Sequence, residues 1–298
     1  SVNSGAGTQA PAVCVDPPTG CTVPKPQGPT SNGHVSAQDF VASDGVNVYA
    51  VSTYHTSHNS SNNTYGFPVW SCPIVGYGSG CVSFNLNLST LYTYQGITSV
   101  DVAVDTAGVV GQPGATYLFI TDACSSPCVD WYIHRCPVAD SGSVACTRHE
   151  SSGGRIGVGM VVANGYLWVA LRKMGLAGNG LLWRCGLWTN DDCQVFDDPK
   201  GPDLLSLEVG GGYLWVGRSD GVIWRCNMEA ANHCAVWDTA GGSIEALSYD
   251  GAGTLYAAVQ YASKKKPGVV WSCSTAHANG CIAVPADTGA IGSGGVFN

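Results

Sequence analysis

The stretch Tyr213-Leu-Trp-Val-Gly-Arg-Ser-Asp-Gly-Val-Ile-Trp-Arg-Cys226 reads as two apolar strands joined by a Ser-Asp-Gly turn, and a short loop then leads to Cys234. Alternating residues, aromatic and β-branched side chains and a turn glycine are typical of an antiparallel hairpin. Similar stretches occur at four other places, and the two nearest the N-terminus are looser copies. They are residues 48–52 with 69–72, 117–120 with 133–136, 166–172 with 182–185, and 254–259 with 270–273. The chain is therefore built from an internal repeat.

Each repeat contains two further predicted strands. A strand ending in a turn precedes each hairpin, at residues 40–45, 100–108, 159–165, 205–210 and 244–251. A fourth strand begins at or near the second cysteine of the repeat. The pattern, with four strands in about 40–50 residues, resembles the β-propeller architecture. The resemblance implies an all-β propeller of five complete four-stranded blades, and no segment has the 3.6-residue period of a long helix.

The two ends of the chain carry fragments of a further repeat. Residues 1–33 are rich in Pro and Gly, and their Cys14…Cys21-Thr-Val-Pro24 copies the outer half of a blade, as in Cys273…Cys281-Ile-Ala-Val-Pro285. Residues 288–298 resemble the segment that leads into the fifth inner strand. We expect these two ends to build a sixth, partial blade around the five-bladed region 34–287, either within one chain or between subunits. A strand edge left open is a template for strand addition.

The fourteen cysteines fall into close pairs, about one per repeat. The pairs are Cys14/Cys21, Cys72/Cys81, Cys124/Cys128, Cys136/Cys146, Cys185/Cys193, Cys226/Cys234 and Cys273/Cys281. A zinc site would need doubled CxxC spacing on neighbouring elements, which is missing, so we predict disulfides that pin each outer hairpin. Disulfides indicate an oxidising, extracellular or cell-surface location. The triplets at Asn59, Asn62 and Asn87 are N-glycosylation acceptors and fit the same location.

Composition excludes several classes of partner. Charged residues make up only 11% of the chain and the formal net charge is −8. Without a basic patch, nucleic acid is not an expected partner. No apolar stretch approaches the ~20 residues that span a bilayer. The chain opens on Ser1 without a signal-peptide pattern, so we expect a mature, processed form. A surface with so few charges needs another source of solubility, such as attached glycan. Alternatively, neighbouring subunits cover much of it.

Residues that could perform chemistry are scarce. Glu208 and Glu245, with Asp101, could face a central channel and act as paired carboxylates in glycoside hydrolysis. The favoured interpretation is that these acids form hydrogen bonds to turn backbones or line a wet channel. His55 and His58 could grip a metal, but a glycosylated surface loop is the favoured interpretation. The Asp pairs at 191–192 and 197–198 lack the order of a calcium loop. We therefore predict no cofactor, no metal and no enzymatic activity.

The features that repeat are Trp, Cys and turn Gly, which are framework residues. The polar residues after the second strands differ strongly between repeats, whereas repeated ligand sites would repeat their ligands. We therefore expect a secreted structural protein that polymerises with itself through its N-terminal hairpin and C-terminal strand into a filament or surface layer. The alternative is a carbohydrate-binding, lectin-like propeller, in which exposed Trp side chains would stack on sugars and repeated sites would supply avidity.

Overall fold

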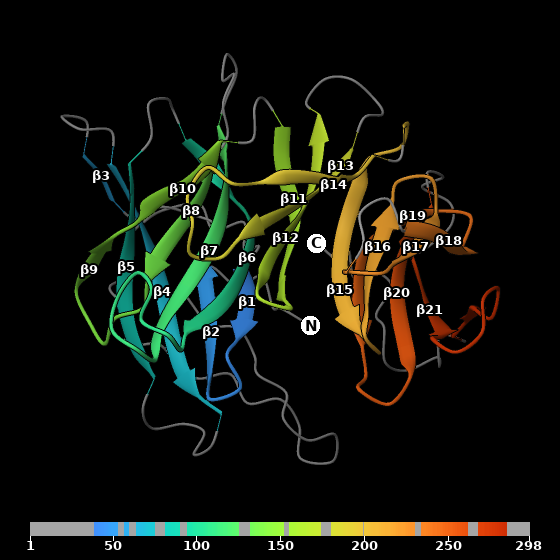
Figure 1. The fold of residues 1–298 in the computed structure, drawn as a ribbon, viewed down its shortest axis with the longest axis horizontal. Helices are drawn as coiled ribbons and strands as arrows, with labels where there is room; N and C mark the ends of the chain where they lie inside the picture. Colours follow the sequence, from blue (N-terminus) through green and yellow to red (C-terminus); the bar gives the residue numbers. More distant parts are fainter. Residues whose placement is uncertain are drawn as a thin grey trace. The chain divides into compact units, whose positions relative to one another are not determined.

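The computed structural model describes residues 39–52, 57–59, 64–74, 81–89, 94–124, 132–151, 155–173, 180–198, 200–229, 234–261 and 268–284 (Figure 1). Within these ranges the chain forms 22 strands and no helix. The contacts divide the chain into two compact units. Unit 1 comprises Ser1–Cys128 and Ile133–His149, and unit 2 comprises Val129–Tyr132 and Glu150–Asn298. We number the five sheets of the described residues in chain order.

Unit 1 contains the first sheet and nearly all of the second, of which residues 132 and 150–151 fall in unit 2. The first sheet has β1 (Asp39–Ser43), β2 (Asn47–Ser52), β4 (Thr64–Pro73) and β5 (Val82–Ser89) in that order. The second sheet has β6 (Tyr94–Asp105), β7 (Ala115–Cys124), β8 (Tyr132–Pro137) and β10 (Thr147–Ser151), with β6 at one edge and β10 at the other.

The first sheet departs from the four-stranded prediction. It gains β3 (Ser57–Asn59), which pairs with β4, and β9 (Ser143–Ala145), which pairs with β5 in parallel. The sequence before Trp70 is longer than in the other repeats, so the chain can fold back on β4. The loop after β8 is long enough to reach the outer edge of the first sheet. Both additions cover strand edges that would otherwise be exposed.

Unit 2 contains three four-stranded antiparallel sheets whose strands follow one another in chain order. The third sheet has β11 (Arg155–Ala163), β12 (Tyr166–Lys173), β13 (Leu181–Gly186) and β14 (Gln194–Asp197). The fourth has β15 (Leu204–Gly210), β16 (Tyr213–Arg218), β17 (Val222–Cys226) and β18 (Cys234–Thr239). The fifth has β19 (Ser243–Tyr249), β20 (Thr254–Gln260), β21 (Val269–Ser274) and β22 (Ile282–Ala283). The expected all-β chain of repeated four-stranded sheets is confirmed at this level.

The predicted turns have the backbone that their residues favour. Asn164 and Gly165, between β11 and β12, both have positive φ, at 51° and 75°, which matches the twist of an antiparallel hairpin. In the Ser-Asp-Gly turn of the fourth sheet, Gly221 has φ 85°, and a Cβ there would lie 2.7 Å from the carbonyl oxygen of Gly242. Glycine is required at this position on both counts.

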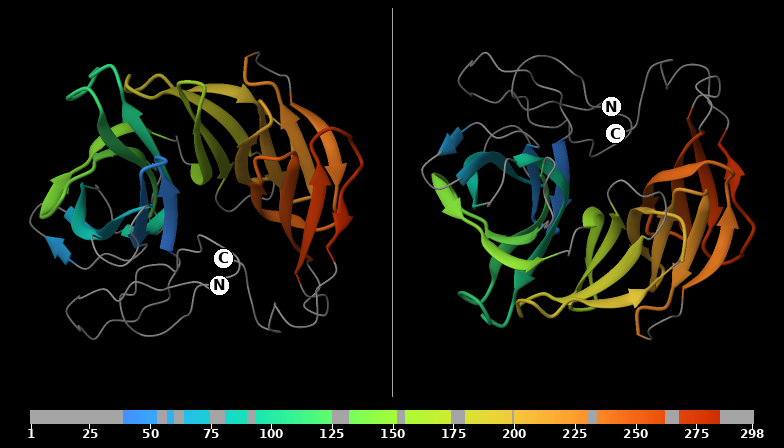
Figure 2. Two further views of the ribbon diagram at one scale, coloured as in Figure 1. Left: turned by 90° about the horizontal axis from the view of Figure 1, so that it is seen from below. Right: turned by 90° about the horizontal axis from the view of Figure 1, so that it is seen from above.

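The sheets pack face to face through aliphatic and aromatic side chains. Trp168 and Phe196 of the third sheet contact a cluster with Leu214 and Val216 of the fourth. Trp215, Ile223 and Trp237 of the fourth sheet contact a cluster with Leu255 and Ala257 of the fifth. Figure 2 shows the fourth and fifth sheets of unit 2 lying side by side. We call the face that packs on the sheet next in sequence the forward face.

Five disulfides pin the third strand of each sheet to the start of its outer strand. They are Cys72–Cys81, Cys136–Cys146, Cys185–Cys193, Cys226–Cys234 and Cys273–Cys281, five of the seven predicted pairs. The other two pairs lie outside the described residues, because they include Cys14, Cys21 and Cys128 and the side chain of Cys124. The end segments 1–33 and 288–298, Asn62 and His55 also lie outside them. The five disulfides indicate an oxidising environment.

Candidate functional site

The forward face of the fourth sheet is built around three side chains. Trp215 lies on the second strand, Arg225 directly opposite it on the third, and Trp237 on the fourth. The two indole rings meet edge to face with centroids 5.5 Å apart. The guanidinium of Arg225 lies 4.0 Å from the centroid of Trp237 and 4.5 Å from that of Tyr213. Aromatic packing and cation–π attraction therefore act at the same place.

The third sheet repeats this arrangement. Trp168 and Phe196 meet edge to face at 4.7 Å, and the guanidinium of Arg184 lies 4.7 Å from the ring centroid of Tyr166 and 5.7 Å from that of Phe196. The spacing is identical in both sheets: the arginine directly precedes the first cysteine, and the fourth-strand aromatic follows the second cysteine by three residues. In both sheets the arginine lies beside the aromatic side chain of its own outer strand, and no sequence signal specified the rings that it contacts.

At three places in unit 2, a carboxylate on an outer strand accepts a hydrogen bond from the disulfide hairpin of the next sheet. Asp197 accepts a hydrogen bond from the backbone N–H of Cys234 at 3.2 Å, and Asp238 accepts one from that of Cys281 at 2.8 Å. Glu150 accepts one from the N–H of Cys193 at 3.2 Å. We call these three contacts the carboxylate clasps. Each clasp residue follows the second cysteine of its repeat by four residues.

The fifth sheet has a forward face that no other described sheet of unit 2 covers. Tyr256 takes the place of Trp215 and is 40% exposed, whereas Trp215 is fully buried. Val284 takes the place of Trp237 and is 39% exposed, against 7% for Trp237. The burial of β20 alternates along the strand, while β16 is buried almost continuously. The alternation shows one covered face and one open face.

The open face carries small or apolar uncharged side chains. Tyr256 pairs with Ser248 on one side and Ser272 on the other. The neighbouring row of the same face is Ala246, Ala258 and Val270. Ser272 occupies the position of Arg225, and Pro285 occupies the position of the clasp residue Asp238. The face therefore keeps its aromatic side chain but lacks the arginine and the clasp.

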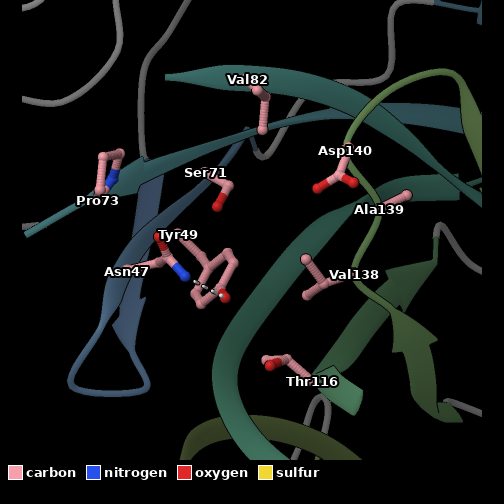
Figure 3. Close-up of a pocket in the computed structure, with 9 residues that line it drawn as sticks. All are labelled: Asn47, Tyr49, Ser71, Pro73, Val82, Thr116, Val138, Ala139 and Asp140. Carbon is pink, nitrogen blue, oxygen red and sulfur yellow. Dashed lines mark hydrogen bonds between the residues drawn. The ribbon is translucent and has the colours of Figure 1, made fainter. Parts of the chain in front are cut away.

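A separate cavity of about 380 Å³ lies within unit 1, between β2, β4 and β5 of the first sheet and β7 and the loop after β8 of the second (Figure 3). Its lining residues are Asn47, Tyr49, Ser71, Pro73, Val82, Thr116, Val138, Ala139 and Asp140.

Tyr49 is the best-defined polar group of this cavity. Its hydroxyl donates a hydrogen bond to Asp44 at 2.8 Å and accepts one from the amide of Asn47 at 3.4 Å. Burial, together with the hydrogen bond to the Asp44 carboxylate and its charge, raises the pKa of Tyr49 to about 12. Burial alone would raise the pKa of Asp44, but hydrogen bonds from the Asn47 and Val46 amides and from Tyr49 outweigh it and lower that pKa. The pair is therefore a neutral phenol on a charged carboxylate at neutral pH.

The predicted acidic candidates have separate partners. Glu208 accepts a hydrogen bond from the N–H of Val209 at 2.9 Å, and burial raises its pKa. Burial also raises the pKa of Glu245, while the charge of Arg172 opposes the shift. In unit 1, Asp101 accepts from the N–H of Val102 at 2.8 Å. Glu208 and Asp101 therefore fit the backbone-bonding interpretation.

Metal and sugar sites find little support. His58 lies on β3, and in the described part of the chain no group of three or more His, Cys, Asp or Glu side chains could hold a metal. Asp197 serves as a clasp residue, and Asp192 accepts from the N–H of Gly186. Trp168, Trp215 and Trp224 are buried, so their rings are not available for stacking on sugars.

No helix among the described residues is long and apolar enough to cross a membrane.

Comparison with known proteins gives fold-level similarity only. No protein-family model and no curated protein matches the chain. A puromycin-hydrolysing peptidase of Mycobacterium tuberculosis is similar with a TM-score of 0.51 and 14% identity, covering 80% of this chain and 35% of that one. At such identity the likeness concerns the fold alone.

Two further solved structures are similar at lower scores. The WD40 domain of Toxoplasma gondii coronin has a TM-score of 0.49 and 10% identity, and the alignment covers 82% of this chain and 58% of that one. The computationally designed Ika8 protein has a TM-score of 0.44 and 11% identity, with 82% and 73% covered. Independently of these neighbours, repeated antiparallel sheets that each carry a disulfide between the third and the outer strand are typical of a β-propeller-like repeat architecture.

Proposed function

We propose that this protein is a secreted, non-enzymatic structural protein that assembles with copies of itself through the open forward face of its fifth sheet. The observation that carries the proposal is the exposure of Tyr256 and Val284 at positions where the fourth sheet buries Trp215 and Trp237. A repeat protein buries its apolar faces against neighbouring repeats, so a terminal face without a polar cap is a surface for another repeat.

The occupant that we propose is the N-terminal segment of a second copy. Residues 13–24 repeat the outer half of a blade, including the Cys14…Cys21 pair. Residues 1–38 and 285–298, outside the described residues, are long enough to supply the strands of a further sheet. The residue four positions after Cys21 is Lys25, which cannot accept a hydrogen bond as Asp238 does. The sequence pattern of the clasp is thus missing at both boundaries of this additional repeat, after Cys21 and after Cys281.

Where neighbouring repeats lack a clasp, their contact is the easiest to break, so a repeat can there be exchanged between copies. A contact from the head of one copy to the tail of the next does not close on itself, so it generates a filament. The low fraction of charged residues, 11%, fits a surface that neighbouring copies or glycans cover. We include glycans at Asn59, Asn62 and Asn87 in the proposal.

The test is the particle size of the purified full chain, measured by light scattering and electron microscopy. We expect filaments or sheets from the wild type and mainly monomers from Tyr256→Lys, which places a charge on the open face. Val109→Lys is the matched control, because Val109 is 61% exposed on a turn of unit 1, and it is expected to assemble normally. Deleting residues 1–33 is also expected to prevent assembly while the described sheets stay folded.

Two results would overturn the proposal. A wild-type protein that stays monomeric at high concentration would mean that the face is not used between copies. Normal assembly of Tyr256→Lys would show that copies meet through another surface.

A further inference from the structure

The cavity in unit 1 lies where the third and fourth sheets have an arginine. Ser71 directly precedes Cys72, as Arg184 precedes Cys185 and Arg225 precedes Cys226. Ser71 pairs with Tyr49 across β2 and β4, as Arg225 pairs with Trp215 across β16 and β17. The first sheet therefore has the aromatic side chain of a forward face without the cation that accompanies it in the third and fourth sheets.

The cavity lies at the position of the missing side chain. In the fourth sheet the guanidinium of Arg225 lies between the rings of Tyr213 and Trp237, 4.5 and 4.0 Å from their centroids. In the first sheet a short serine stands at this position, and the cavity of about 380 Å³ opens beside it. Figure 3 shows Ser71 and Tyr49 on one side of the cavity, with Val138, Ala139 and Asp140 facing them from the loop after β8.

The cavity lining favours a positive charge. Asp140 contributes a carboxylate, and the hydroxyls of Ser71 and Thr116 can accept hydrogen bonds. Among the residues that the structure describes, no Lys, Arg or His lines the cavity. Asp44 adds a second negative charge behind the Tyr49 hydroxyl, to which it is hydrogen-bonded. A planar cation that donates several N–H groups, with an apolar stem along Val82 and Val138, matches this lining.

We propose that the cavity between the first two sheets binds a guanidinium group, of which the arginine side chain is the commonest biological source. The guanidinium would lie beside the Tyr49 ring and donate to Asp140 and Ser71. The proposal rests on unit 1 alone and is independent of assembly through the fifth sheet.

Agmatine is a suitable probe, because it is an arginine side chain without the carboxylate. It would be titrated into the full-length protein and followed by calorimetry and by thermal unfolding. We expect saturable binding by the wild type and a loss of affinity of about 10-fold or more in Asp140→Asn, because a charge-assisted hydrogen bond disappears. Glu229→Gln, which removes one exposed negative charge in unit 2, is the matched control and is expected to bind agmatine like the wild type.

Ser71→Arg supplies the guanidinium from the chain itself. We expect this variant to unfold at a higher temperature than the wild type and to lose agmatine binding. If Ser71→Arg fails to fold, the Asp140→Asn titration still decides. Absence of agmatine binding at millimolar concentration would overturn the proposal. So would binding of a neutral sugar such as glucose at the same site with an affinity that Asp140→Asn leaves unchanged.

Discussion

The carboxylate of Asp238 accepts a hydrogen bond from the backbone N–H of Cys281 at 2.8 Å, so the outer strand of the fourth sheet is fastened to the disulfide hairpin of the fifth. The second oxygen of Asp238 accepts from the N–H of Thr239 at 2.6 Å. Close by, the indole N–H of Trp237 donates to the carbonyl of Ser274 at 3.1 Å. The outer edges of neighbouring sheets are thus joined by polar contacts, while their middles are joined by apolar packing.

Removing this clasp is expected to destabilise unit 2. Asp238 is only 7% exposed, so Asp238→Ala leaves the Cys281 N–H without its charged acceptor in a partly buried place. We expect a loss of about 1.5–3 kcal/mol in the free energy of unfolding, measured with denaturant. Asp238→Asn keeps an acceptor oxygen and is expected to lose less. Glu229→Ala, at an exposed position, is the control, and an equal effect of the two alanine variants would contradict the role of the clasp.

The Tyr49–Asp44 contact predicts a loss of stability at high pH. The pKa of Tyr49 is about 12 in the folded protein against an ordinary value of 10.0, so the unfolded chain loses its proton first as pH rises. The stabilisation is therefore complete below about pH 10 and declines between pH 10 and 12, by about 2–3 kcal/mol in total. Unfolding measured from pH 8 to 12 tests this.

Tyr49→Phe is the matched variant, since it keeps the ring and removes the ionising hydroxyl. It is expected to be less stable than the wild type at pH 8 and to lose less stability between pH 10 and 12. A wild-type curve parallel to that of Tyr49→Phe over this range would show that the hydroxyl is not held on Asp44.

Arg225 of the fourth sheet is expected to stabilise the fold through its charge as well as through packing. Arg225→Met keeps an unbranched apolar stem but removes the guanidinium between Tyr213 and Trp237. We expect a loss of about 0.5–2 kcal/mol. A double-mutant cycle with Trp237→Leu separates the two contributions, and a coupling energy near zero would mean that the ring and the cation act independently.

Repetition in the sequence was enough to predict the strands, the turns and the cysteine pairing pattern, because each depends on residues close together in the chain. The clasps also have a sequence pattern, an acidic residue four positions after Cys146, Cys193 and Cys234. Its role could not be predicted, because the N–H group that donates to each acid lies 37 to 43 residues further along the chain.

Other features depend on tertiary placement and have no local signature. The parallel pairing of β9 with β5 joins residues 85–87 to 143–145. The cavity beside Tyr49 becomes visible only when Ser71 is compared with Arg184 and Arg225 in their packed positions. The open face of the fifth sheet likewise follows from burial, since Tyr256 has the same sequence position as Trp215.

Replacing Glu208 is expected to stabilise the protein, whereas replacing a clasp residue is expected to destabilise it. Burial raises the pKa of its carboxyl group in the folded protein, so the charged form disfavours folding at neutral pH and the protonated form does not. Glu208→Gln keeps an oxygen that can accept from Val209, and it is expected to raise the unfolding temperature by a few degrees at pH 7. At pH 3 both states of the wild type carry a protonated carboxyl group, so the difference between wild type and variant is expected to vanish. A destabilisation by Glu208→Gln at pH 7 would instead mean that the charge of Glu208 has a favourable partner, and it would reopen the interpretation of the inner-strand acids as functional groups.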